Sequence, residues 1–173
     1  MERAQGPSPE DTGEAARQGQ DCGRVRGRGS ALTLYLDTNA LVKLLIDEPG
    51  SDIAESAIQD ARISIASRLA YVEVHSALTR MAVGRRLTQR AYRVAVELFT
   101  DLWDEVGAVE VDGQLIAHAA ELARGHRLRA YDAVHLASAL SVKREPDFAF
   151  ACWDQDLRSA AAAEGLELIP ADA

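Results

Sequence analysis

The feature that most constrains the fold is a short apolar run, residues 32–36, which ends abruptly on Asp37. The run reads Leu-Thr-Leu-Tyr-Leu, and such nearly continuous apolar character is typical of a strand buried on both faces of a parallel sheet. The chain then restarts with a helical pattern from residue 40. In open α/β sheets, ligands bind at the edge where strands pass into helices. Asp37 is therefore either a helix cap or part of a site.

Strand and helix patterns alternate along the rest of the chain. Apolar or alternating runs predict further strands at 62–66, 106–111, 148–152 and 166–169. The spacing of apolar residues predicts helices at 40–45, 51–59, 69–83, 88–103, 114–124, 130–140 and 155–164. Gly84 is expected to end the 69–83 helix in a left-handed conformation. This order predicts one α/β domain over residues 32–173, with a mostly parallel sheet and helices on both faces.

Charge and composition narrow the class of protein. The formal net charge is −8, and the five arginines and five acids of residues 1–31 cancel, so the rest of the chain carries all of it. A strongly acidic domain lacks the broad basic field of a duplex-DNA binder. Residues 1–31 contain almost nothing apolar, which predicts a disordered segment or a misassigned start. No apolar stretch is long enough to cross a bilayer or to form a signal peptide, so a cytoplasmic location is expected.

Four acids share a suggestive context. Asp37 and Asp154 each follow an apolar strand, Asp132 lies in the first turn of a predicted helix, and Glu73 lies beside the apolar stripe of another. Each of them has an ordinary explanation when taken alone, because strand-end and first-turn acids commonly cap helices or offset the helix dipole. Strand ends and helix starts of a parallel sheet nevertheless meet at one edge, so the four acids are expected to converge.

Convergence of four carboxylates needs compensation. Two carboxylates about 4 Å apart repel by roughly 4 kcal/mol at an effective dielectric near 20. Either some of the carboxyls have raised pKa values and stay neutral, or a cation offsets their charge. An all-oxygen site suits Mg²⁺ or Mn²⁺, which bind one or two carboxylates and keep several waters. The chemistry that such a site favours is hydrolysis of phosphodiester bonds.

Four segments resemble the motifs of one family. They are Leu-Asp37-Thr38-Asn39 after a strand, Tyr-Val-Glu73-Val in a helix, Tyr-Asp132-Ala-Val-His135-Leu-Ala, and Trp-Asp154-Gln-Asp156-Leu. In order and spacing they are similar to the four motifs of PIN domains, and the short chain resembles VapC toxins, the ribonucleases of bacterial toxin–antitoxin modules. The resemblance covers about residues 32–170. It implies an α/β/α fold with a five-stranded sheet in the order 3-2-1-4-5 and cleavage of RNA that depends on Mg²⁺ or Mn²⁺.

The resemblance also implies roles for individual residues. Asp37 and Asp132 would be the principal metal ligands, while Glu73 and Asp154 would support the metal or its water. Thr38, with Asn39 beside it, would support a ligand from outside the metal's own shell. The chain departs from the family pattern at Trp153, where many relatives have a small polar residue, and Asp156 is the alternative to Asp154. His135, one helical turn after Asp132, is predicted to pack or hydrogen-bond rather than to act as a base.

An acidic site needs basic groups around it to hold an RNA backbone. The densest basic stretch of the folded part lies between two predicted helices, and Arg127 and Arg129 precede Asp132. The basic stretch is either a solvated corner or an edge that contacts phosphates. The candidate RNA-binding residues are Arg85, Arg86, Arg90, Arg93 and Arg129.

Two other functions compete with a metal-dependent endoribonuclease. A phosphatase of the haloacid dehalogenase type also has an Asp after its first strand, but it needs a second Asp where this chain has Asn39. The other alternative is a catalytically inactive PIN-like module that binds RNA or a partner, against which the full set of acids argues. The resemblance further implies a homodimer and an antitoxin partner whose basic C-terminal segment would place an Arg or Lys among the acids.

Overall fold

The computed structural model describes residues 31–143 and 147–172 of the 173-residue chain. The expectations for the N-terminal segment therefore lie outside the described residues, apart from Ala31. In the described part, five strands and seven helices follow the order β1, α1, α2, β2, α3, α4, β3, α5, α6, β4, α7, β5. The strands are Thr33–Leu36, Ile63–Ser67, Gly107–Val109, Phe148–Ala151 and Glu167–Ile169. The helices are Thr38–Leu45, Ser51–Asp60, Arg68–Val83, Gln89–Glu105, Gly113–His126, Ala130–Val142 and Gln155–Ala163.

The strands form one parallel sheet in the order β3-β2-β1-β4-β5, which confirms the predicted α/β class and strand order. The central strand β1 pairs with β2 on one side and with β4 on the other, where Leu36 lies opposite Ala151. Asp37 and the residues that follow Ala151 therefore leave the sheet at the same edge. The strand predicted at 106–111 is shorter, because β2 ends at Ser67 and offers β3 no partner beyond Val109.

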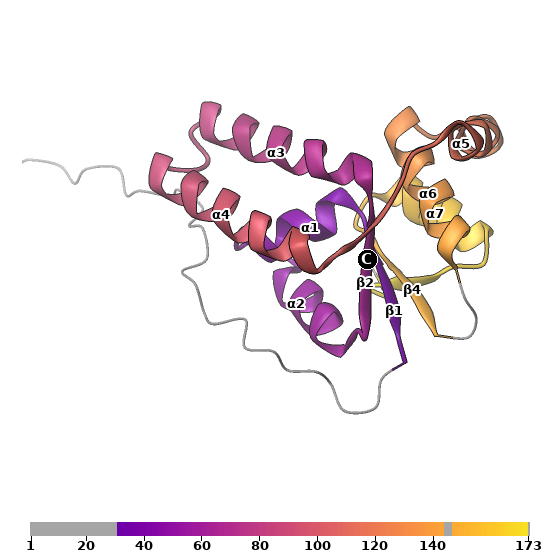
Figure 1. Ribbon diagram of the computed structural model, residues 1–173, viewed down its shortest axis with the longest axis horizontal. Coiled ribbons are helices and arrows are strands. Elements are labelled where there is room, and N and C mark those ends of the chain that lie inside the picture. The colour runs from indigo at the N-terminus through magenta and orange to yellow at the C-terminus, as the bar shows by residue number, and fades with distance from the viewer. Residues whose placement is uncertain (1–30, 144–146, 173) are drawn as a thin grey trace, which may run out of the picture.

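Alternate residues of β1 belong to two separate cores. Leu34 and Leu36 pack with the apolar side chains of α1, α3 and α4, whereas Tyr35 packs with those of α5, α6 and α7. Figure 1 shows the resulting three layers, with α1 to α4 on one face of the sheet and α5 to α7 on the other. Since side chains alternate along a strand, a run that is apolar at every position must be covered on both faces. Within the described residues, no helix is both long enough and apolar enough to traverse a bilayer.

The end of α3 differs from the prediction. Gly84 has a φ of −74° and lies in ordinary right-handed space, while the next residue, Arg85, takes the left-handed conformation with φ 59°. The left-handed residue at the end of this helix is therefore Arg85, one position after the glycine. The N–H of Arg86 bonds to the carbonyl of Met81, which supplies one of the end bonds that a helix terminus requires.

Trp153, the residue that departs from the family pattern, packs away from the sheet edge against the α1–α2 turn. Gly50 in that turn has a φ of +87°, and a Cβ on it would lie 2.7 Å from Nε1 of Trp153. Lys43 Nζ lies 5.2 Å from the centre of the indole ring and bonds to Glu48 Oε1 at 2.8 Å. The tryptophan thus ties the segment that carries Asp154 to the turn between α1 and α2.

This packing gives a first prediction, the effect of Gly50→Ala. The substitution should lower the free energy of unfolding by at least about 1 kcal/mol, because it combines a left-handed backbone with a steric clash against Trp153. Gly113→Ala is the matched control, since a Cβ there meets nothing within 4 Å and the position begins α5. Urea unfolding of both variants measures the difference. Equal stability of the two variants would contradict the proposed contact.

Candidate active site

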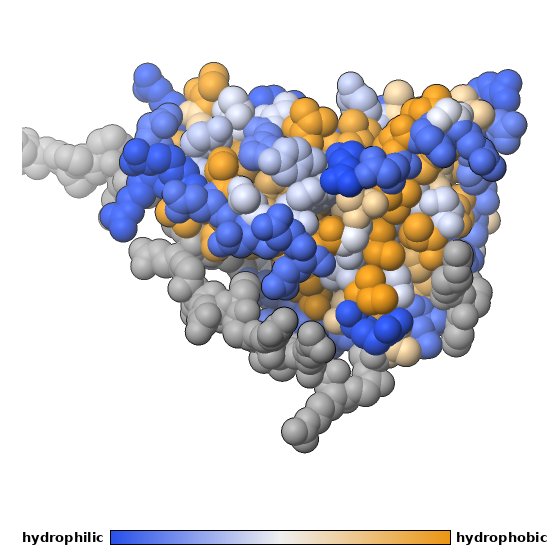
Figure 2. All heavy atoms as spheres, in the orientation of Figure 1, coloured by the Kyte–Doolittle hydropathy of each residue, from blue (hydrophilic) through white to orange (hydrophobic). Residues whose placement is uncertain are grey.

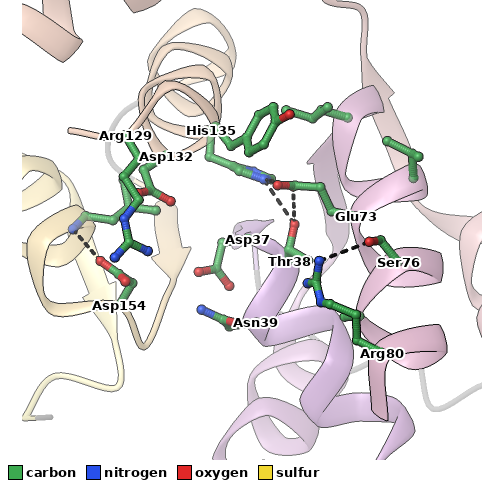
Figure 3. A pocket seen from close by; sticks show the side chains of 15 residues that line it. Asp37, Thr38, Asn39, Glu73, Ser76, Arg80, Arg129, Asp132, His135 and Asp154 are labelled. Carbon is green, nitrogen blue, oxygen red and sulfur yellow. Dashed lines mark hydrogen bonds and ion pairs between the residues drawn. The ribbon is translucent and has the colours of Figure 1, made fainter. Parts of the chain in front are cut away.

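The four predicted acids meet in one cleft at the carboxyl edge of the sheet. The cleft has a volume of about 480 Å³, and Asp37, Glu73, Asp132 and Asp154 all line it. Four elements supply them: the end of β1, the first half of α3, the first turn of α6 and the segment after β4. Thr38, Asn39 and Arg129 line the same cleft, as Figure 3 shows. The structure therefore brings together every predicted residue of the acidic set and its neighbours.

Asp37 lies at the bottom of this arrangement and is 2% exposed. Its Oδ1 accepts a hydrogen bond of 2.6 Å from the N–H of Ala40, so it caps α1 as well as lining the cleft. Burial raises its pKa from 3.8 to about 6, with a smaller contribution in the same direction from Asp154. The hydrogen bond from Ala40 and the proximity of His135 act against this shift without cancelling it. The charged form of Asp37 is therefore costly until a cation offsets it.

Asp132 and Asp154 face the cleft from the other side of the sheet edge. Burial raises the pKa of Asp132, and Asp154 raises it further, while Arg129 acts in the opposite direction. Asp154 caps α7 by accepting a 3.0 Å hydrogen bond from the N–H of Leu157. Asp156, the alternative fourth acid, is exposed and does not line the cleft. The geometry thus favours Asp154 over Asp156 as the fourth acid of the site.

The pKa of Glu73 shifts in the opposite direction to those of Asp37 and Asp132. Its Oε2 accepts a hydrogen bond of 2.5 Å from Thr38 Oγ1 and another of 2.7 Å from His135 Nε2. Burial alone would raise the pKa of Glu73, but the bonds from His135 and Thr38 outweigh it and leave the pKa below its ordinary value. Glu73 is therefore held in its charged form. His135 is 3% exposed and hydrogen-bonded, which agrees with the role predicted for it.

Arg80 is the basic residue of the cleft that the sequence interpretation missed. It lines the cleft together with Arg129, bonds to Ser76 Oγ at 3.0 Å, and lowers the pKa of Glu73. The spacing in the sequence indicates this position, because Arg80 lies seven residues after Glu73 and so falls on the same face of one helix.

The basic stretch between α3 and α4 does not reach the cleft. Arg85 follows α3 and lies twelve residues after Glu73, roughly 18 Å away at about 1.5 Å per residue. The side chains of this stretch are exposed and lie on the hydrophilic surface over α4 and its preceding turn (Figure 2). Four of the predicted RNA-binding residues therefore do not line the cleft: Arg85, Arg86, Arg90 and Arg93.

The donor set fits a hard divalent cation. The cleft offers carboxylate oxygens from four acids together with the side-chain oxygens of Thr38 and Asn39. Among the residues that the structure describes, no group of three or more His, Cys, Asp and Glu side chains is arranged to hold a metal ion. Mg²⁺ needs fewer protein ligands than such a group provides, because this ion binds one or two carboxylates and retains waters. Asp37 and Asp132, whose pKa values are both raised, are the residues that such a cation would relieve most.

Fold and cleft together define an α/β/α protein whose acidic side chains gather at the carboxyl edge of a parallel sheet. A family profile described as PIN domain matches residues 34–171. Ribonuclease VapC45 of Mycobacterium tuberculosis (strain CDC 1551 / Oshkosh) is 41% identical over 138 residues, which make up 80% of this chain and 95% of that protein. The chain therefore belongs to the PIN domain family and, within it, to the VapC type.

Solved structures share the fold at low sequence identity. The crystal structure of PAE2754 from Pyrobaculum aerophilum matches with a TM-score of 0.58 and 17% identity, covering 83% of this chain and 88% of that one. A toxin–antitoxin complex from Klebsiella pneumoniae matches with a TM-score of 0.53 and 17% identity, covering 71% and 88%. At this identity the likeness concerns the arrangement of helices and strands. It agrees with the family assignment.

Proposed function

We propose that the protein is the toxin component of a toxin–antitoxin module and a Mg²⁺- or Mn²⁺-dependent endoribonuclease. The observation that carries the proposal is the convergence of four acids from four elements on one cleft, with Asp37 buried at its base. The sequence match to a protein named a ribonuclease supports the choice of RNA as substrate. A cation bound at this edge would offset the repulsion between the four carboxylates and attract a phosphate.

In this proposal each residue has a distinct task. Asp37 and Asp132 would hold the metal, which when bound would supply positive charge for the scissile phosphate and lower the pKa of a bound water. Glu73, kept charged by its hydrogen bonds, would orient the attacking water. Asp154 completes the negative charge on the opposite side of the cleft. Asn39 is exposed in the cleft and can donate its amide N–H groups to a phosphate oxygen.

The rim of the cleft suits single-stranded RNA. Arg80 and Arg129 lie on different helical walls and can each contact a phosphate. Tyr131, which also lines the cleft, is 61% exposed, and an exposed ring beside a phosphate site offers a stacking surface to an unpaired base. A paired base would not present its face to this ring. Cleavage should therefore occur in loops and unpaired segments.

An antitoxin is the proposed protein partner. The folded part of the chain carries the whole net charge of −8, which favours a basic partner segment. A structural relative was solved as a toxin–antitoxin complex. An Arg or Lys of such a segment, placed among Asp37, Asp132 and Asp154, would offset their charge as a metal does and so block the site. We also propose that the protein forms a homodimer, and this proposal rests on the family resemblance alone.

The alternative function is a PIN-like module that binds RNA without cutting it. A site that has lost its activity usually lacks at least one of the acids, whereas this chain retains all four in the cleft. The same experiment separates the two functions. A binding module would retain RNA on the rim arginines with or without a divalent cation.

The experiment is cleavage of a mixed pool of structured and single-stranded RNAs by the partner-free protein in Mg²⁺, Mn²⁺ or EDTA. The proposal predicts cutting in unpaired segments with either metal and none in EDTA. Thermal melting in the same buffers shows whether the cation binds, since a ligand that binds only the folded state raises the melting temperature. Cutting that persists in EDTA would refute the metal-dependent mechanism. Metal binding and RNA retention without any cutting would favour the binding module.

The rim assignment gives its own prediction. Arg129→Gln and Arg80→Gln should each raise KM for RNA about tenfold with a smaller effect on kcat, because each removes one charged contact to a phosphate. Arg90→Gln is the matched control, since Arg90 is exposed on α4 and lies outside the cleft lining. Steady-state cleavage of a short labelled RNA measures these constants. A larger effect from Arg90→Gln would move the RNA path to the α3–α4 corner.

A further inference from the structure

Glu73 is connected to the second core of the protein through His135. Figure 3 shows His135 and Thr38 converging on the carboxylate of Glu73. Thr38 Oγ1 and His135 Nε2 are also only 3.1 Å apart, and both bond to the same oxygen, Oε2. On its other side, His135 Nδ1 lies 3.2 Å from the hydroxyl of Tyr35. A continuous set of buried contacts thus runs from the middle of β1 to an acid of the cleft.

The positions of the protons follow from what each group can donate. Glu73 is ionised and offers only lone pairs, so both groups that bond to its Oε2 must be donors. Thr38 gives its single hydroxyl proton to Glu73, and His135 must therefore carry a proton on Nε2.

The contact of Nδ1 with the Tyr35 hydroxyl holds the other side of the His135 ring. Tyr35 is fully buried, and burial raises its pKa far above the ordinary value, so its hydroxyl keeps its proton. Ser138 also reaches this hydroxyl, and because its own proton goes to the carbonyl of Val134 at 2.7 Å, its Oγ is a second acceptor for the Tyr35 proton. Tyr35 therefore holds the His135 ring in place.

We propose that His135 is a positioning residue: Tyr35 holds its ring, and its Nε2–H fixes the Glu73 carboxylate so that Oε1 is left for the cleft. In the part of the chain that the structure describes, Oε2 accepts both side-chain hydrogen bonds of Glu73. Without His135, Thr38 would hold the carboxylate by one bond and leave it free to rotate. The inference rests on the proposed function in one respect, the task of Glu73 at the metal site.

The first test reads the proton on Nε2 directly in the metal-free full-length protein. Nitrogen-15 NMR of labelled histidine should show His135 protonated at Nε2. A proton on Nδ1 with Nε2 bare would overturn the proposal. This measurement needs neither metal nor RNA, so its result stands even if the protein cleaves no RNA.

The second test separates positioning from packing. His135→Leu keeps an apolar side chain in the core but removes the donor, whereas His135→Gln places an amide N–H near the position of Nε2. Loss of a partner that orients a metal-site residue typically costs about 10- to 100-fold in metal affinity or activity. We expect that loss in Mn²⁺ affinity, measured with Mn²⁺ alone, and in kcat for His135→Leu. His135→Gln should regain most of both.

The controls keep folding apart from function. His118→Gln, on an exposed position of α5, should change neither Mn²⁺ affinity nor kcat. Melting temperatures identify any variant that fails to fold, and in that case Tyr35→Phe carries the test, because it removes the hydroxyl contact to Nδ1 without emptying the ring site. Mn²⁺ affinity that is unchanged in folded His135→Leu and in Tyr35→Phe would refute the positioning role. Altered Mn²⁺ affinity without RNA cleavage in the unmodified protein would instead refute only the proposed nuclease function.

Discussion

Replacing Asp37 or Asp132 by asparagine is expected to lower kcat/KM for metal-dependent RNA cleavage by about a thousandfold, which corresponds to about 4 kcal/mol of transition-state stabilisation. Asparagine keeps the size of the side chain and an oxygen that can accept the Ala40 hydrogen bond, so the cap of α1 survives in Asp37→Asn. What it removes is the negative charge that holds the cation. Single-turnover cleavage of a labelled single-stranded RNA measures the loss.

Asp156→Asn is the matched control for this prediction. The residue lies two positions after Asp154 in the first turn of α7, but it is exposed and stays outside the cleft. Its rate should equal that of the unmodified protein. Comparable losses from Asp156→Asn and Asp37→Asn would mean that general negative charge, rather than the cleft, supports cleavage. Full activity of Asp132→Asn would remove Asp132 from the metal site.

The second large effect concerns the stability of the metal-free protein. The pKa of Asp37 is raised from 3.8 to about 6 by burial, so the folded state binds its proton more tightly than the unfolded state does. Above pH 6 this difference destabilises the fold by about 3 kcal/mol, and the penalty is relieved as the pH falls from about 6 to about 4. Asp132 shifts in the same direction. The metal-free protein should therefore become more stable between pH 7.5 and pH 5, by about half of that amount.

The variant Asp37→Asn should remove this penalty. In EDTA at pH 7.5 its melting temperature is expected to rise by roughly 6 to 12 °C, and the rise should shrink towards pH 5. Added Mn²⁺ should stabilise the unmodified protein but not the variant. Differential scanning calorimetry over the pH series supplies the values. A lower melting temperature for Asp37→Asn in EDTA would show that the charged form of Asp37 is stabilised in the fold, contrary to its burial.

Most of the architecture and the acidic set were predictable from the sequence, because they depend on local patterns. Strands that are apolar at every position predict a parallel sheet covered on both faces, and acids placed directly after such strands must lie at its carboxyl edge. Asp37 and Asp154 follow β1 and β4, which are neighbours in the sheet. The order of the sheet itself came from the family resemblance, since hydrophobic pattern alone does not say which strands pair.

Other features depended on how elements pack. The sequence placed the rim cations in its densest basic stretch, but α3 carries that stretch away from the cleft and brings Arg80 to it instead. Asp154 was the predicted fourth acid and Asp156 its alternative, and the structure places Asp154 in the cleft as the cap of α7 while Asp156 lies exposed in the first turn of that helix.

By itself, the sequence determined the class of fold, the edge where the site lies and the four acids that form it. Each of these follows from residue type and from neighbours within a few positions. The tertiary structure decided which cations share the cleft, that Trp153 packs against Gly50, and that Glu73 bonds to His135 across 62 positions of sequence. Such contacts join side chains of separate helices and strands. Their distances are set by the packing of whole elements, which no local pattern encodes.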